Sequence, residues 1–369
     1  MVLIEPIINC VRKERGRLVG RHCLELPWNR LQAGSCRLPC QASIRSFRQQ
    51  ACNLIIIENA NNKVTSNPQQ NHQATFLATR ISNMSGLLPN YDIANCPEYK
   101  ALEKFVSGKK KDLDSALNNF CDPVETKAQS GGQDAEEIIE ALLWRAWQSV
   151  TALAAKTSDL DHLRRLGAAV ATIRDRAHVR SAGEVLKVYD AIVWQDLPVF
   201  GLQLREAWNY SGRPHYFFFG PRGHTDGHYS IAATDLSSEE ERSAWLNLNV
   251  FTAHLVASSR DPGLSMFGLW VIRTAFEEQA ETLDNTSISV AALWLSYAGE
   301  YLQELSRKGE TFDGKVAKPG SRFSDKDWRG FTEERWKMWK QRLREVSGQG
   351  LDVHAADIVE SCMENIEDL

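Results

Sequence analysis

Three residues in one short segment have the types and spacing of metal ligands. His224, Asp226 and His228 alternate in a glycine-containing segment, and His354 is a conceivable further ligand. A His-x-Asp pair with a distant histidine is the ligand set of facial-triad iron sites. Those sites normally lie on a β-barrel, whereas this loop joins predicted helices. The competing interpretation is an exposed, variable insertion with chance histidines, so no cofactor is predicted.

A second group could line a pocket for a small molecule. Its aromatic and charged members are Trp194, Asp196, Arg205, Glu206 and Trp208. Tryptophan rings with a few convergent polar groups are typical of ligand pockets. However, tryptophans at helical spacing commonly fill cores, and charged residues beside an apolar stripe commonly form its solvated border. Buried, convergent Arg205 and Glu206 side chains would favour the pocket, and outward-pointing ones would favour simple packing.

A third group lies on a basic helix predicted over residues 332–346. Trp336 and Trp339 share this helix with five cationic residues: Arg335, Lys337, Lys340, Arg342 and Arg344. A basic aromatic helix can bind membranes or acidic partners. Alternatively, its tryptophans anchor the helix to the core.

Common catalytic motifs are missing from the sequence. There is no G-x-x-x-x-G-K-[ST] loop, no G-x-G-x-x-G, no G-x-S-x-G and no H-E-x-x-H. No catalytic residue is therefore predicted.

The elements that must position these groups are helices. Apolar residues recur at helical spacing in ten segments, which are residues 97–106, 112–120, 138–153, 160–173, 197–208, 238–255, 266–280, 288–305, 332–346 and 353–366. Asp196 is the expected N-cap of the fifth, with Pro198 in its first turn, and residues 185–189 could form a strand or a helix end. The sequence predicts an all-α fold, a single bundle or array of about 8–10 helices. No apolar run approaches the roughly 20 residues of a membrane-spanning helix.

Residues 1–83 differ from the remainder. They carry 11 basic and 4 acidic residues, five of the eight cysteines and no sustained periodicity. We expect a disordered or non-native extension, with Met84 as a possible true start, before an all-helical domain over residues 84–369. The alternatives are a mitochondrial presequence or a zinc site made by Cys23, Cys36 and Cys40 with His22, although the paired C-x-x-C spacing is missing.

The composition of residues 84–369 bears on partners and compartment. Their net charge of −11 argues against nucleic acid as a partner. Their three widely spaced cysteines make no disulfide framework, so a reducing, cytoplasmic location is expected.

Five segments of the sequence resemble the fungal family catalogued as domain of unknown function 3632, over about residues 95–369. The residues that carry the resemblance are Trp194, Asp196–Pro198, Arg205, Glu206 and Trp208, then Trp245–Leu255, Arg273–Glu277, Ala291–Gly299, and finally Gly330, Phe331, Trp336, Trp339 and Lys340. The resemblance implies a fungal, intracellular helical protein and brings no established reaction or site residue.

Two function classes follow from these observations. The first is a non-enzymatic interaction or scaffold protein whose partner is an unknown protein or small molecule, with no nucleic acid and no membrane. The alternative is a small-molecule-binding protein or enzyme with a tryptophan-lined pocket near Trp194–Trp208.

Overall fold

The structure is a computed structural model that describes residues 92–108, 112–210, 239–279, 284–313 and 317–366. Residues 1–83, Met84, the cysteines of the zinc hypothesis and the His224–His228 segment lie outside these ranges. Every helix in the described residues is too short or too polar for a membrane span.

Ten α-helices make up most of the described chain, so the predicted all-α class is confirmed. They are α4 (Pro97–Ser107), α5 (Leu113–Ser130), α6 (Ala135–Lys156), α7 (Leu160–Ile173), α8 (Phe200–Tyr210), α9 (Glu239–Ser259), α10 (Ser265–Phe276), α11 (Asn285–Lys308), α12 (Glu333–Ser347) and α13 (Val353–Ile366). Two 3-10 turns, η1 (Ile93–Asn95) and η3 (Ser321–Phe323), accompany them.

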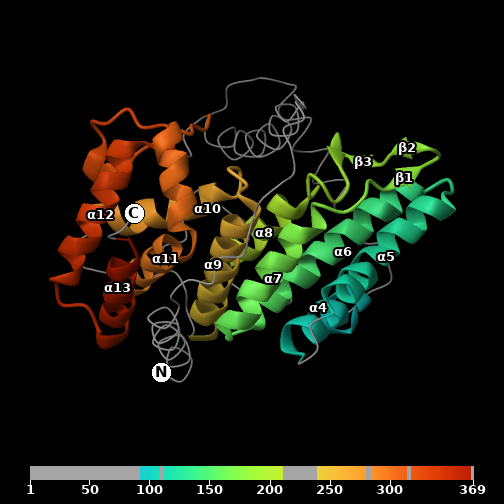
Figure 1. Cartoon of the computed structure of the whole chain (residues 1–369), viewed down its shortest axis with the longest axis horizontal. Coiled ribbons are helices and arrows are strands. Elements are labelled where there is room, and N and C mark those ends of the chain that lie inside the picture. Colours follow the sequence, from blue (N-terminus) through green and yellow to red (C-terminus); the bar gives the residue numbers. More distant parts are fainter. Residues whose placement is uncertain (1–91, 109–111, 211–238, 280–283, 314–316, 367–369) are drawn as a thin grey trace, which may run out of the picture.

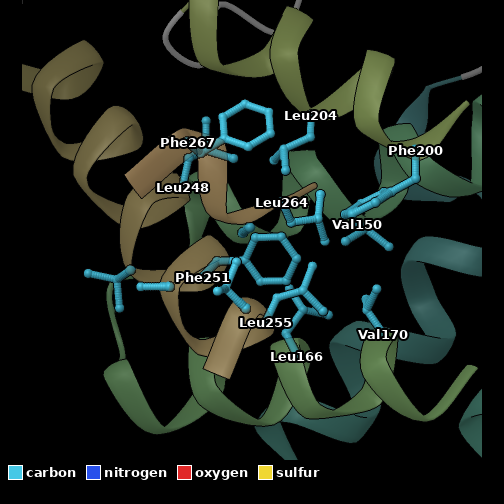
Figure 2. Packing of buried hydrophobic residues seen from close by; sticks show 14 of the residues in the cluster. Val150, Leu166, Val170, Phe200, Leu204, Leu248, Phe251, Leu255, Leu264 and Phe267 are labelled. Carbon is cyan, nitrogen blue, oxygen red and sulfur yellow. The ribbon is translucent and has the colours of Figure 1, made fainter. Parts of the chain in front are cut away.

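Helix α9 is the centre of the array. It packs against α6 and α7 on one side and against α11 on the other, and α11 in turn contacts α12 and α13 (Figure 1). One continuous hydrophobic cluster extends from Cys96 to Ile366. Figure 2 shows side chains of α6, α7, α8 and α10 meeting around Phe251 of α9. Because α9 is covered on several sides, most of its side chains between Ala244 and Val256 are buried.

Helix α5 is longer than predicted. We expected it to end at residue 120, before Asp122 and Pro123, because proline inside a helix costs about 3 kcal/mol. It continues through Pro123 to Ser130, so the predicted end is wrong. Phe120, Val124 and Ala128 lie on its buried face on both sides of the proline. This continuous burial outweighs the lost backbone hydrogen bond.

Two short hairpins join α7 to α8. Strand β1 (Arg180–Ser181) pairs antiparallel with β2 (Glu184–Val185), and β3 (Lys187–Val188) pairs with β4 (Ala191–Ile192). Their two-residue turns, Ala182–Gly183 and Tyr189–Asp190, have positive φ at both positions, as type I′ turns require. Of the two alternatives for residues 185–189, the strand is therefore the one observed.

His254 of α9 makes stability depend on pH. Its ring lies 4.2 Å from the Tyr297 ring of α11, between centroids, and burial, aided by Arg164, lowers its pKa to about 4 against the opposing effect of Asp161. In the unfolded chain the imidazole takes up its proton near pH 6.5. The contribution of neutral His254 to the free energy of unfolding is therefore fully present above pH 6.5. It is lost as the pH falls towards 4, and the loss is at most about 3 kcal/mol.

Urea unfolding of the wild type and of His254→Phe at pH 7 and pH 4.5 measures this contribution. Phenylalanine keeps a ring beside Tyr297 but has no proton to bind. We expect the variant to lose less stability between the two pH values than the wild type loses. Equal losses would contradict the assignment to His254.

Candidate functional site

The proposed metal ligands cannot be brought together from the described residues. His224, Asp226 and His228 lie outside them, and His354 lies alone on α13. Within the described ranges, no group of three His, Cys, Asp or Glu residues is placed to hold a metal ion. The metal hypothesis stays a prediction.

Trp194 and Trp208 belong to two different aromatic clusters. The Trp194 ring is fully buried 5.9 Å from that of Trp147, and its Nε1 donates a hydrogen bond to Oε1 of Glu125 at 3.0 Å. Trp208 packs 4.9 Å from Phe267 and 6.0 Å from Trp245, again between ring centroids. Both rings are part of the interhelical packing.

The charged residues of this group, Asp196, Arg205 and Glu206, interact with the backbone or with one another. Asp196 Oδ2 accepts a hydrogen bond from the Ile192 backbone N–H at 2.8 Å. Arg205 and Glu206 form an ion pair of 3.3 Å at partly exposed positions on α8. The pair leaves the buried Nε of Arg205 without a hydrogen-bond partner among the described residues. A pocket at Trp194–Trp208 stays a prediction.

The start of α8 differs from the prediction. The helix begins at Phe200, so the expected N-cap at Asp196 is wrong. Leu197 and Val199 have φ values of +47° and +60°, which are incompatible with a right-handed helix. The carboxylate of Asp196 caps the preceding turn instead. Trp147 holds this segment from α6, because its Nε1 donates to the Pro198 carbonyl at 2.9 Å.

One face of α12 is anchored in the core by a buried ion pair. Arg335 and Glu277 have no exposed side-chain surface, and Arg335 donates to both carboxylate oxygens at 2.7 and 2.9 Å. Its other N–H groups donate to the carbonyls of Ala317, Lys318 and Gly330. Trp339 Nε1 donates to Glu277 Oε1 at 2.7 Å. Trp339 is therefore structural, as the anchoring alternative predicts, and so is Arg335, which was expected to be one of the basic binding residues.

Three other basic residues of α12 face a cleft against α11, whereas Arg342 pairs with Glu345 outside it. The cleft has a volume of about 360 Å³ and is lined by Gln303, Ser306 and Arg307 of α11 and by Glu333, Trp336, Lys337, Lys340 and Arg344 of α12. The α12 members recur at three- and four-residue intervals, which places them on one side of the helix. We call this feature the basic cleft.

Positive charge in the basic cleft exceeds negative charge. Lys337 lies 3.9 Å from Glu333, the one carboxylate in the lining. In the part of the chain that the structure describes, no ion pair engages Arg307, Lys340 or Arg344. Three cations from two helices therefore converge without protein carboxylates to offset them. This arrangement favours binding of an anion.

Trp336 adds a neutral indole donor to the lining. The residue is only 5% exposed, and its buried Nε1 has no hydrogen-bond partner in the part of the chain that the structure describes. By contrast, five other tryptophans donate their indole N–H to a protein acceptor, and these are Trp147, Trp194, Trp294, Trp328 and Trp339. A buried N–H without an acceptor is costly, so an acceptor supplied by a ligand would be stabilising.

Sequence reasoning identified the α12 side of the basic cleft and missed the α11 side. The helical spacing of Lys337, Lys340 and Arg344 predicts a shared face. Nothing in the α11 segment signals that Gln303 and Arg307 meet that face, because their proximity depends on how the two helices pack.

Comparison with known proteins gives one match. The family model described as "Protein of unknown function (DUF3632)" matches residues 147–343, which is more than half of the chain. The match extends from α6 into α12 and contains most of the cleft lining. No curated protein and no solved structure matches the sequence.

Proposed function

The chain belongs to the DUF3632 family of proteins of unknown function, and we propose that it is a non-enzymatic interaction protein that binds an acidic segment of a partner protein. The site of binding is the basic cleft between α11 and α12. The observation that carries the proposal is the convergence there of Arg307, Lys340 and Arg344 without offsetting carboxylates among the described residues.

A protein segment suits the cleft better than a nucleic acid or a membrane. Residues 84–369 carry a net charge of −11, so the positive potential is confined to the neighbourhood of the cleft. Extended polyanions would meet repulsion beyond it, whereas a short acidic segment would not. The scaffold that presents the cleft is rigid, because α12 is fixed to α10 through Arg335 and Glu277.

We also propose that the protein acts in the cytoplasm. Cys96, Cys121 and Cys362 are free and buried, and burial raises the pKa of the Cys96 thiol to about 11. Free thiols are typical of proteins in reducing compartments. A fungal source remains part of the proposal through the family resemblance alone.

Fluorescence anisotropy with a labelled poly-glutamate peptide tests the proposed binding. The variant is Lys340→Glu/Arg344→Glu, which reverses two cleft charges. The control is Lys100→Glu/Lys104→Glu, which reverses two exposed charges at the same spacing on α4. We expect the cleft variant to bind at least about tenfold more weakly, since each reversal replaces an attraction by a repulsion.

The control variant should bind as the wild type does, and added salt should weaken binding to the wild type most. Equal binding by the two double variants would contradict a site in the basic cleft. Absence of binding to the wild-type chain would contradict the proposed function itself.

A further inference from the structure

We propose that the anionic group bound in the basic cleft is a phosphomonoester, and that Trp336 donates its indole N–H to one of the phosphate oxygens. This inference rests on the proposed function, because it specifies the chemistry of the acidic segment. Two features of the lining carry it: the charge of the cleft and the unpartnered nitrogen of Trp336.

The charge of the cleft matches a dianion better than a single carboxylate. Arg307, Lys340 and Arg344 leave up to three positive charges unpaired among the described residues, after Lys337 is matched with Glu333. A carboxylate carries one negative charge, whereas a phosphomonoester carries about −1.5 to −2 at pH 7. The dianion therefore offsets more of the charge that the two helices bring together.

The directions of the donors also suit a phosphate. Arg307 comes from the last turn of α11, and Lys340 and Arg344 come from consecutive turns of α12. Donors from two helices approach a ligand from different sides, which suits the three acceptor oxygens of a tetrahedral phosphate. A planar carboxylate offers two oxygens on one edge.

Trp336 supplies a neutral donor beside these cations. Its Nε1 is buried and has no acceptor among the described residues, although Trp336 lines the cleft. Trp245 of α9 has the same unsatisfied nitrogen, but its ring packs against Trp208 in the aromatic cluster away from α12. A phosphate oxygen that is bound by the cations would place an acceptor next to the indole of Trp336.

The phosphomonoester could belong to a phosphorylated side chain of the partner or to a small free compound. The cleft volume of about 360 Å³ lies at the lower end of the range for ligand pockets and is sufficient for either. The proposed function favours the side chain. The experiment therefore includes a probe for each source.

Three peptides of one sequence, with serine, glutamate or phosphoserine at the central position, are compared by anisotropy on the full chain, with O-phospho-L-serine as a competitor. We expect the phosphoserine peptide to bind at least about tenfold more tightly than the glutamate peptide. Its affinity should fall several-fold between pH 7 and pH 5.5, where the phosphate takes up its second proton with a pKa near 6. The affinity of the glutamate peptide should change little over that range.

Trp336→Phe tests the indole directly. Phenylalanine keeps an aromatic ring, although a smaller one, and removes the N–H. Since that N–H has no partner among the described residues, the change breaks no hydrogen bond that the structure shows. We expect about tenfold weaker binding of the phosphoserine peptide. The matched control is Trp328→Phe, which removes an indole N–H that donates to Glu334 outside the cleft and should leave binding unchanged. In ¹H–¹⁵N spectra, the Trp336 indole signal should move when inorganic phosphate is added.

Each outcome bears on one part of the proposal. Equal affinity for the glutamate and phosphoserine peptides would overturn the phosphate inference and leave the proposed function in place. Failure of both peptides would overturn the proposed function as well. If O-phospho-L-serine binds as tightly as the phosphoserine peptide, the phosphate inference holds but the source is a small molecule. Unchanged binding by Trp336→Phe would overturn the role of the indole.

Discussion

Arg335→Met should lower the free energy of unfolding by about 3–5 kcal/mol, because it leaves the Glu277 carboxylate buried without its cation. Both side chains are completely buried, and Arg335 holds Glu277 through two hydrogen bonds. Methionine retains the aliphatic part of the side chain, so the loss comes mainly from the missing guanidinium charge and its hydrogen bonds. Urea unfolding at pH 7 measures the difference.

The double variant Glu277→Gln/Arg335→Met distinguishes the ion pair from packing. It removes both charges, so it should be less destabilised than the sum of the two single variants, with a coupling of at least about 1 kcal/mol. It should not reach wild-type stability, because Arg335 also donates hydrogen bonds to the carbonyls of Ala317 and Gly330, and methionine cannot replace them. Additive effects of the two substitutions would contradict a coupled pair.

An exposed pair on α7 provides the matched comparison. Arg164 and Asp161 lie 2.9 Å apart, and roughly half of each side chain is exposed to solvent. Arg164→Met should cost less than about 1 kcal/mol, since solvent screens the exposed charges. Comparing the losses of unfolding free energy in Arg164→Met and Arg335→Met shows how much burial increases the cost of breaking an ion pair.

The consequences of losing the buried pair extend beyond α12. Glu277 follows α10, and its Oε2 also accepts a hydrogen bond from the Gly320 backbone N–H at 2.9 Å. A Cβ at position 320 would lie 2.6 Å from the Glu277 carbonyl oxygen, so only glycine allows this approach. The Glu277 carboxylate therefore helps to fix the segment between α11 and α12 to the end of α10. The Arg322 N–H, which donates to the Glu277 carbonyl, and the Ser321 N–H, which donates to Glu278, do the same. Weakening the buried pair should loosen the wall of the basic cleft that α12 forms.

The sequence predicts the helices well where an apolar face is continuous. The predicted starts at residues 97 and 353 coincide with the observed starts of α4 and α13. The predicted helix bounds are wrong where packing against distant parts of the chain determines them, as at Pro123 in α5 and at Asp196 before α8. Local signals for a helix break and a helix cap are present at these positions, but the surrounding core overrides them.

The same limit applies to the candidate site. In the sequence, Arg335 is indistinguishable from the other basic residues of an exposed helix face. Its burial depends on Glu277, which lies 58 residues earlier in the chain. Arg307 likewise gives no local sign of the basic cleft. Periodicity indicates which side chains share a helix face, and it carries no information about which face of another helix they meet.

Trp147→Ala should also lower the free energy of unfolding by about 3–5 kcal/mol, as is typical when a large aromatic ring is removed from a core. The Trp147 ring lies 5.0 Å from Phe200, 5.6 Å from Phe120 and 5.9 Å from Trp194, between centroids. Trp147→Phe keeps part of this packing but removes the N–H that donates to Pro198. We expect a smaller loss of about 1–3 kcal/mol, measured by urea unfolding.

Local hydrogen exchange distinguishes the hydrogen bond from Trp147 to Pro198 from the packing of the Trp147 ring. Leu197 and Val199 flank Pro198 and hold positive φ values, which cost roughly 1–3 kcal/mol each unless the surroundings enforce them. Once the Trp147 hydrogen bond is lost, the segment can relax, so the amides of Ile192 and Asp196 should exchange with solvent faster than the core. Trp294→Phe is the control, because Trp294 is as buried but donates to Asn249 of α9. It should destabilise the fold without selective exchange at residues 192–199. Equal local exchange in the two variants would mean that the strained segment is held by its own hairpin and not by α6.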